Sequence, residues 1–104
     1  MASGRFGKAN PAANADIDLY TVPPGAVATA NVCFCNRTNA PIAVRLAVRS
    51  AALTDADYLE FGTVIPANGI LERTGIAMTA GEIITVRAAA AGVSVRAHGF
   101  EEAA

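Results

Sequence analysis

The chain has 104 residues, of which 53% are hydrophobic and only 6% aromatic, and eight basic against nine acidic residues give a net charge of −1. This length supports one hydrophobic core, and an interior built from alanine and branched aliphatic residues suits two thin sheets better than a deep ligand pocket. A near-neutral charge balance leaves no field of one sign to attract nucleic acid or an anionic membrane.

The first 16 residues are small or polar, with almost no bulky apolar side chain. This composition predicts an extended N-terminal arm over residues 1–16, either disordered or ordered only by lying across a neighbouring subunit. Phe6 is the side chain that could anchor such an arm to another subunit. The segment lacks the continuous apolar stretch of a secretory signal, so we expect synthesis in the cytoplasm.

From residue 17 onward, apolar residues recur with a period of two, which is typical of half-buried strands. Turns rich in Pro, Gly and Asn separate the predicted strands, and residues 51–57 are expected to form a loop or one helical turn capped by Thr54 or Asp55. The predicted strands cover residues 17–22, 27–36, 42–49, 58–65, 70–78, 83–88 and 93–97.

Short strands with no amphipathic helix between them predict an antiparallel β-sandwich, jelly-roll or immunoglobulin-like, of about seven or eight strands. We expect one sandwich domain over residues 17–102, with a closed barrel as the less favoured alternative. Gly75 lies inside a predicted strand and suggests a bulge there. In the strand 58–65, the alternation places Leu59, Phe61, Thr63 and Ile65 on one side.

In the strand 27–36, alternation places Val32 and Phe34 inward and the two cysteines outward. Cys33 and Cys35 leave the same face about 7 Å apart, a separation that disfavours a disulfide between them. They are interpreted as small apolar residues on a partly buried face. A bridge between subunits and a metal site are the alternatives.

Several basic residues lie at outward positions of predicted strands. Arg45 and Arg49 share one face of the strand 42–49, where they are either solvated or part of an interface. Arg73 and Glu72 lie on opposite faces, so a buried Arg73 would need a carboxylate, which could come from a neighbouring chain.

His98 is the only histidine of the chain. It shares a strand face with Ser94 and Arg96, but Ser94 lies about 13 Å away along the strand, too far for the hydrogen bond that activates a serine nucleophile. We therefore expect His98 to be solvated or at a subunit contact, where its titration could make assembly sensitive to pH. The acidic residues of segment 55–60 offer neither a carboxylate pair across a cleft nor the spacing of a calcium loop.

No catalytic, cofactor-binding or metal-binding residue is therefore predicted, and a hydrolase is the least favoured of the functions considered. The candidate interface residues are those that could meet a neighbouring subunit, namely Phe6, Arg45, Arg49, Arg73, Arg96 and His98.

Six short blocks follow one another along residues 17–102: LYTVP at 19–23, CNRT at 35–38, IPANG at 65–69, LERTG at 71–75, GVSVR at 92–96 and GFEE at 99–102. In this order they resemble the small virion structural proteins of tailed bacteriophages. The resemblance implies a β-sandwich that decorates a capsid or forms part of a neck, tail or fibre. It carries over no catalytic residues.

These observations together predict a capsid decoration or cement protein of the virion. We expect it to stabilise the shell through homo-oligomeric contacts, with a trimer as the first expectation and the major capsid protein as a further partner. A neck, tail or fibre accessory protein is the nearest alternative, and a carbohydrate-binding module for host adhesion is another. No apolar run is long enough to span a bilayer, so neither a membrane nor nucleic acid is an expected partner.

Overall fold

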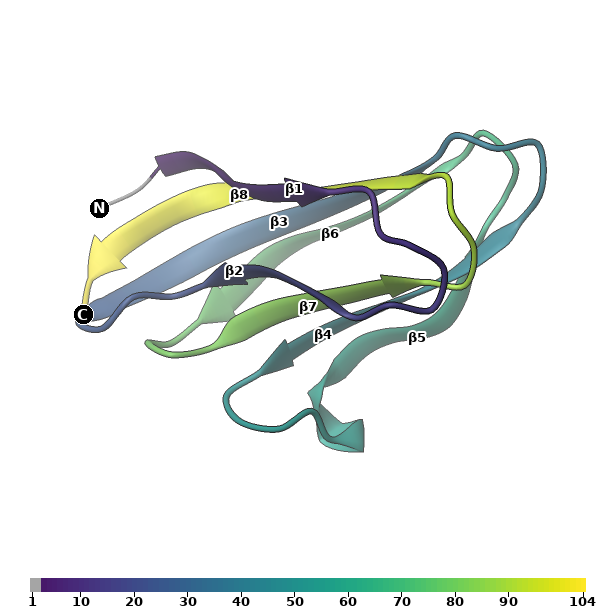
Figure 1. Cartoon of the computed structure of the whole chain (residues 1–104). Helices are drawn as coiled ribbons and strands as arrows, with labels where there is room; N and C mark the ends of the chain where they lie inside the picture. Colours follow the sequence, from purple (N-terminus) through teal and green to yellow (C-terminus); the bar gives the residue numbers. More distant parts are fainter. Residues whose placement is uncertain (1–2) are drawn as a thin grey trace.

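The computed structural model describes residues 3–104, which form eight antiparallel strands in two sheets packed face to face (Figure 1). The strands are β1 (Ser3–Ala9), β2 (Ile17–Thr21), β3 (Ala26–Asn36), β4 (Ile42–Arg49), β5 (Tyr58–Ile65), β6 (Ile70–Met78), β7 (Ile83–Ala88) and β8 (Val93–Ala103). One sheet has the order β1-β8-β3-β6 and the other β2-β7-β4-β5. They are called here the β3–β8 sheet and the β4–β7 sheet, after their central strands. The predicted β-sandwich is confirmed.

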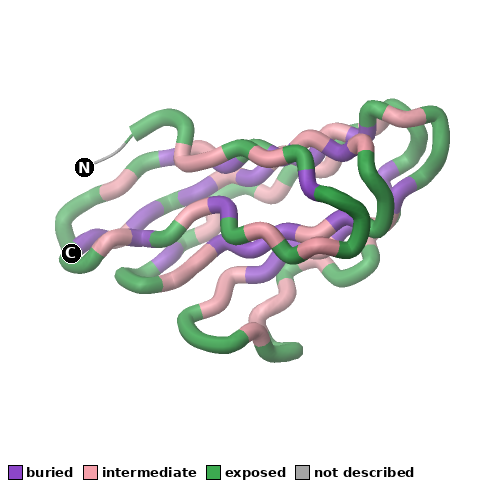
Figure 2. The backbone as a smooth tube through the Cα atoms, in the orientation of Figure 1, coloured by how far each residue is buried: buried purple, intermediate pink, exposed green. Residues whose placement is uncertain are grey.

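The core fills the space between the two sheets. Every second residue of β3 from Ala26 to Phe34 is buried, and the same alternation continues in β8 at Val93, Val95 and Ala97. Figure 2 shows these buried positions alternating with partly exposed ones along the strands. Many core residues are alanine and valine, and the molecule is only 19 Å thick along its shortest axis.

The predicted bulge at Gly75 is confirmed. The pairing of β3 with β6 shifts register between Ala30 and Val32, and Gly75 has a φ of 68° at this point. The Gly75 amide donates a 3.0 Å hydrogen bond to Oδ1 of Asn31. A positive φ is readily adopted by glycine, so Gly75 is suited to the extra residue of the bulge.

The predicted face of β5 is wrong at Phe61. Two register shifts in the pairing with β4 leave Leu59 and Gly62 without a direct partner. Each extra residue reverses the alternation, because side chains of a strand alternate with a period of two. Thr63 and Ile65 stay on the inner side, whereas Phe61 lies opposite Arg45 and is 62% exposed.

Residues 3–9 do not form a separate arm. They are the edge strand β1, which pairs with β8 from Ser3 opposite Phe100 to Ala9 opposite Val95. The sandwich therefore begins at Ser3 and not at residue 17, while residues 1 and 2 of the predicted arm lie outside the described part of the chain.

Phe6, the predicted anchor, packs within its own chain. Its ring stacks on that of Tyr20 in β2, with 4.0 Å between centroids and 11° between planes. This stack joins β1 of one sheet to β2 of the other, so Phe6 helps to close that side of the sandwich.

Two local features refine the predicted elements. A turn of 3-10 helix, Asp55–Asp57, precedes β5 and is capped at Thr54, whose amide donates a 2.9 Å hydrogen bond to Asp57. Strand β8 continues to Ala103 because its last residues pair with the start of β3. Within residues 3–104, no helix is long and apolar enough to cross a membrane.

Candidate interaction surfaces

The outer face of the β4–β7 sheet carries charges that are largely paired within the chain. Arg49 lies 2.7 Å from the carboxylate of Asp18 and also donates to Thr85 and to the carbonyl of Ala51. The hydrogen bond from Arg49 lowers the pKa of Asp18, against an opposing effect of desolvation. Arg49, a predicted interface residue, is thus held by contacts inside its own chain.

Arg73 also has an intrachain partner. Its guanidinium lies 2.9 Å from the carboxylate of Glu60 on β5, and Thr63 donates a further hydrogen bond to this carboxylate. The Glu60 side chain is only 14% exposed, whereas that of Arg73 is 43% exposed. A carboxylate from a neighbouring chain, considered above for Arg73, is therefore not required.

The strands β5 and β6 form the open side of the sandwich, opposite the side closed by β1 and β2. Of the large apolar side chains exposed among the described residues, four of five lie on these two edge strands, and the fifth is Phe100 on β8. The four are called here the β5–β6 edge: Leu59, Phe61, Val64 and Ile70. An edge strand also presents unpaired backbone groups, so this side can accept a further strand.

Arg45 and Tyr58 both pack against Phe61. The guanidinium carbon of Arg45 lies 4.2 Å from the centre of the Phe61 ring, and the Tyr58 ring meets it edge to face at 4.8 Å. A hollow of about 450 Å³ beside this pair is lined by Asp55, Tyr58 and Phe61. Arg45 thus lies beside an exposed aromatic ring of this edge, and its role at an interface stays a prediction.

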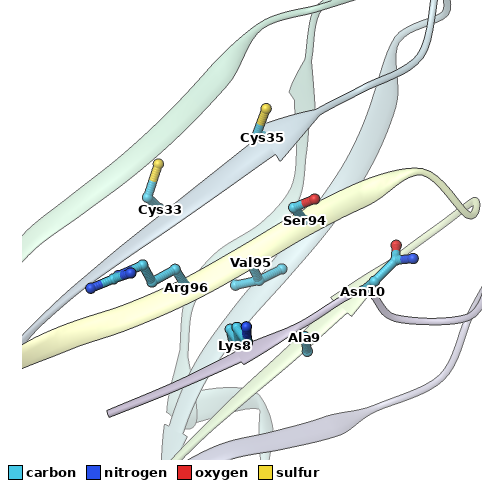
Figure 3. Close-up of a pocket in the computed structure, with 8 residues that line it drawn as sticks. All are labelled: Lys8, Ala9, Asn10, Cys33, Cys35, Ser94, Val95 and Arg96. Carbon is cyan, nitrogen blue, oxygen red and sulfur yellow. The ribbon is translucent and has the colours of Figure 1, made fainter. Parts of the chain in front are cut away.

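The outer face of the β3–β8 sheet carries a hollow with a volume of about 550 Å³ (Figure 3). Figure 3 shows both sulfur atoms on the same side of β3, next to the β8 strand that carries Ser94 and Arg96. Lys8 and Asn10 line the far side of this hollow. We call it the basic hollow, after Lys8 and Arg96.

Both cysteines are free and half-buried in this hollow. Burial raises the pKa of the Cys33 thiol, and the nearby Glu72 carboxylate and Cys35 raise it further. A raised pKa keeps the thiol protonated near neutral pH, and the protonated form is a poor nucleophile and metal ligand. Cys33 is therefore best described as an apolar wall of the hollow.

His98 lies on the same outer face, opposite Arg5 of β1 and Asn31 of β3. Its Nδ1 atom is buried and has no hydrogen-bond partner among the described residues. Arg96 is exposed beside it in the basic hollow. The sequence singled out Arg96 and His98 but not Lys8 or Arg5, because no strand was predicted over residues 3–9.

Comparisons with known proteins identify no relative. No family model, no curated protein and no solved structure matches this chain. Within residues 3–104, no group of three or more His, Cys, Asp or Glu side chains could hold a metal ion. The function is therefore argued from the surfaces described above.

Proposed function

We propose that this protein is a structural component of a bacteriophage particle, a capsid decoration or cement protein that stabilises the shell through contacts with itself and with the major capsid protein. The order of the six sequence blocks supports the viral role. The β5–β6 edge carries the proposal that the protein acts by association.

The size of the exposed apolar surface supports assembly into a small oligomer. Burying a large aliphatic or aromatic side chain fully is worth about 1.5–3 kcal/mol. The four side chains of the edge are exposed by 38% for Leu59 up to 63% for Ile70, so covering them would contribute about 3–7 kcal/mol per copy. Two copies would together contribute about 6–14 kcal/mol, which is comparable with the cost of association, about 4–15 kcal/mol, and contacts with a shell would add to this contribution.

The same edge is built to limit open-ended association. Two register shifts, at Leu59 and Gly62, interrupt the pairing of β5 with β4, and Arg45 places a positive charge beside Phe61. Bulges and charges at an edge strand oppose continuous strand addition, which leads to fibres. A closed oligomer, with a trimer as the first expectation, fits this edge better than a filament.

Native mass spectrometry of the purified protein tests the proposal, with two variants matched in exposure. Phe61 and Phe100 are 62% and 64% exposed, but Phe100 lies on the outer face of the other sheet. We expect a wild-type oligomer that Phe61→Asp dissociates and Phe100→Asp leaves intact. A wild-type protein that stays monomeric and does not co-sediment with phage particles would contradict the proposal, as would equal behaviour of the two variants.

A carbohydrate-binding role in host adhesion is a second candidate, favoured by the exposed ring of Phe61 above the hollow next to Asp55. Sugar-binding sites use such aromatic faces because the ring packs on the apolar side of a sugar. A glycan array separates the two roles. Binding to a glycan that is lost in Phe61→Ala would favour a role in adhesion. If no glycan on the array is bound, the structural role is favoured. A neck, tail or fibre position differs from a shell position in copy number per particle.

A further inference from the structure

Three cations of the β3–β8 sheet have no ion-pair partner among the described residues. The three ion pairs of residues 3–104 involve Arg49, Arg73 and Arg87. None of them involves Arg5, Lys8 or Arg96, which gather on the outer face of β1 and β8. Of the five cations without an ion pair among the described residues, three thus lie on this outer face, and two of these, Lys8 and Arg96, line the basic hollow.

The strand register sets two of these cations, Lys8 and Arg96, side by side. Lys8 lies directly opposite Arg96, and Arg5 lies opposite His98. Like charges directly opposite each other across two strands are destabilising. An anion held between Lys8 and Arg96 would turn this repulsion into attraction, so the arrangement is the one expected of an anion site.

A carboxylate lies beyond the opposite side of the hollow. Glu72 on β6 lies opposite Cys33 on β3, with the apolar thiols between it and the basic rim. A nucleic acid or polyphosphate carries a charge at every unit, so Glu72 would repel it where it crossed the sheet. A ligand with carboxylates on one side and neutral groups on the other fits this arrangement, with its carboxylates at Lys8 and Arg96 and its neutral groups toward Glu72.

We propose that the basic hollow binds an acidic, extended segment of a partner protein. Outward positions two residues apart on a strand are about 7 Å apart, which is the spacing of Arg96 and His98 on β8. On β1, the register shift between Arg5 and Gly7 adds one residue, so Arg5 lies further from Lys8 than this spacing. We therefore assign the main carboxylate contact to Lys8 and Arg96 and a second, longer contact to Arg5.

Asn10 adds a neutral donor at the end of the hollow. Its Oδ1 atom accepts a 2.8 Å hydrogen bond from Arg37, which orients the amide. Its Nδ2 atom has no acceptor among the described residues and can donate to a backbone carbonyl of the bound segment. The contacts proposed here, made by Lys8, Arg96 and Arg5, lie on β1 and β8 and not on the β5–β6 edge, and the inference does not depend on the role in a phage particle.

The test uses the whole protein and a synthetic acetylated peptide of alternating Glu and Val, with a Gln and Val peptide as the neutral probe. Isothermal titration calorimetry should show binding of the acidic peptide, weakening as salt is raised because these charges are screened. The double variant Lys8→Gln with Arg96→Gln should weaken binding about 10-fold to 100-fold, since it removes two charge-assisted contacts. The control Arg87→Gln lies on β7 of the other sheet and should leave the affinity unchanged.

A second readout does not depend on the variants. A peptide seated in the hollow should slow alkylation of Cys33 and Cys35 by iodoacetamide in the wild-type protein, because both thiols line the hollow. No binding of the acidic peptide, equal binding of the neutral peptide, or no protection of the thiols would overturn the inference. Tighter binding of inorganic triphosphate or single-stranded DNA, lost in the same double variant, would overturn the assignment to a polypeptide.

Discussion

Gly7 stands where β1 of one sheet passes close to the backbone of β2 in the other. A Cβ atom added at Gly7 would lie 2.2 Å from the backbone oxygen of Leu19, whereas real Cβ contacts stay above 3.0 Å. In Gly7→Ala, β1 must therefore move away from β2 by close to 1 Å, which also loosens the stack of Phe6 on Tyr20. Overpacking costs about 1–3 kcal/mol and the aromatic pair about 0.5–1.5 kcal/mol, so we expect a loss of about 2–4 kcal/mol.

Urea and thermal unfolding followed by circular dichroism measure this loss. A loss of this size should lower the melting temperature by about 10 °C or more in a domain of this length. Lys8→Ala is the matched control, because the neighbouring side chain points outward and should change stability by about 0.5 kcal/mol at most. If Gly7→Ala unfolds like the wild-type protein, β1 is not packed on β2 and residues 3–9 behave as a free arm.

Three further predictions concern the core, an ion pair and a titration. Phe34 is fully buried, so Phe34→Ala should lose about 3–5 kcal/mol in urea unfolding; a loss below 1 kcal/mol would place it outside the core. Arg73→Ala should lose about 1–2 kcal/mol by leaving Glu60 unpaired, and a double-mutant cycle with Glu60→Ala that shows no coupling would refute the pair. Desolvation, and then the hydrogen bond to Glu101, raise the pKa of Tyr20. The pKa of Tyr20 in the folded protein thus lies above the unfolded value of about 10. Its contribution to the free energy of unfolding is fully present below about pH 10 and is lost as the pH rises above about 10, because the hydroxyl ionises first in the unfolded chain. The 295 nm absorbance difference between wild type and Tyr20→Phe should thus rise only with alkaline unfolding, and a rise near pH 10 in folded protein would contradict it.

The alternation of apolar and polar residues along the sequence was enough to predict most strands of the sandwich. The strand from Ala26 to Asn36 could be predicted within one residue, with Phe34 inward and Cys33 outward, because every second residue is apolar and no bulge interrupts β3 in its pairing with β8. The alternation failed in β5, where the extra residues Leu59 and Gly62 turn Phe61 outward. A bulge of this kind depends on the partner strand and leaves little trace in the sequence.

The edge strand β1 could not be predicted for a related reason. Its residues are mostly small or charged, and Phe6 is its one large apolar side chain, so no period of two is visible. The strand exists because β8 offers a free edge almost a hundred residues away and because Gly7 allows close contact with Leu19. Such long-range pairing is set by the assembled fold and not by the local sequence.

The same limit applies to the candidate sites. Arg45, Arg96 and His98 were identified as outward residues from their strand positions. The partners of Arg49 and Arg73 come from other strands, so their intrachain ion pairs became visible only in the folded chain. The basic hollow likewise depends on β1 lying beside β8.

The proposal that this protein is a virion component is best tested by a cryo-electron microscopy reconstruction of the phage particle to which the proposal assigns it. We expect density for the two-sheet sandwich in many copies on the outside of the shell, with the β5–β6 edge and Phe61 at contacts between proteins. A particle complete without this chain, or copies whose Phe61 faces solvent with no neighbour, would contradict it.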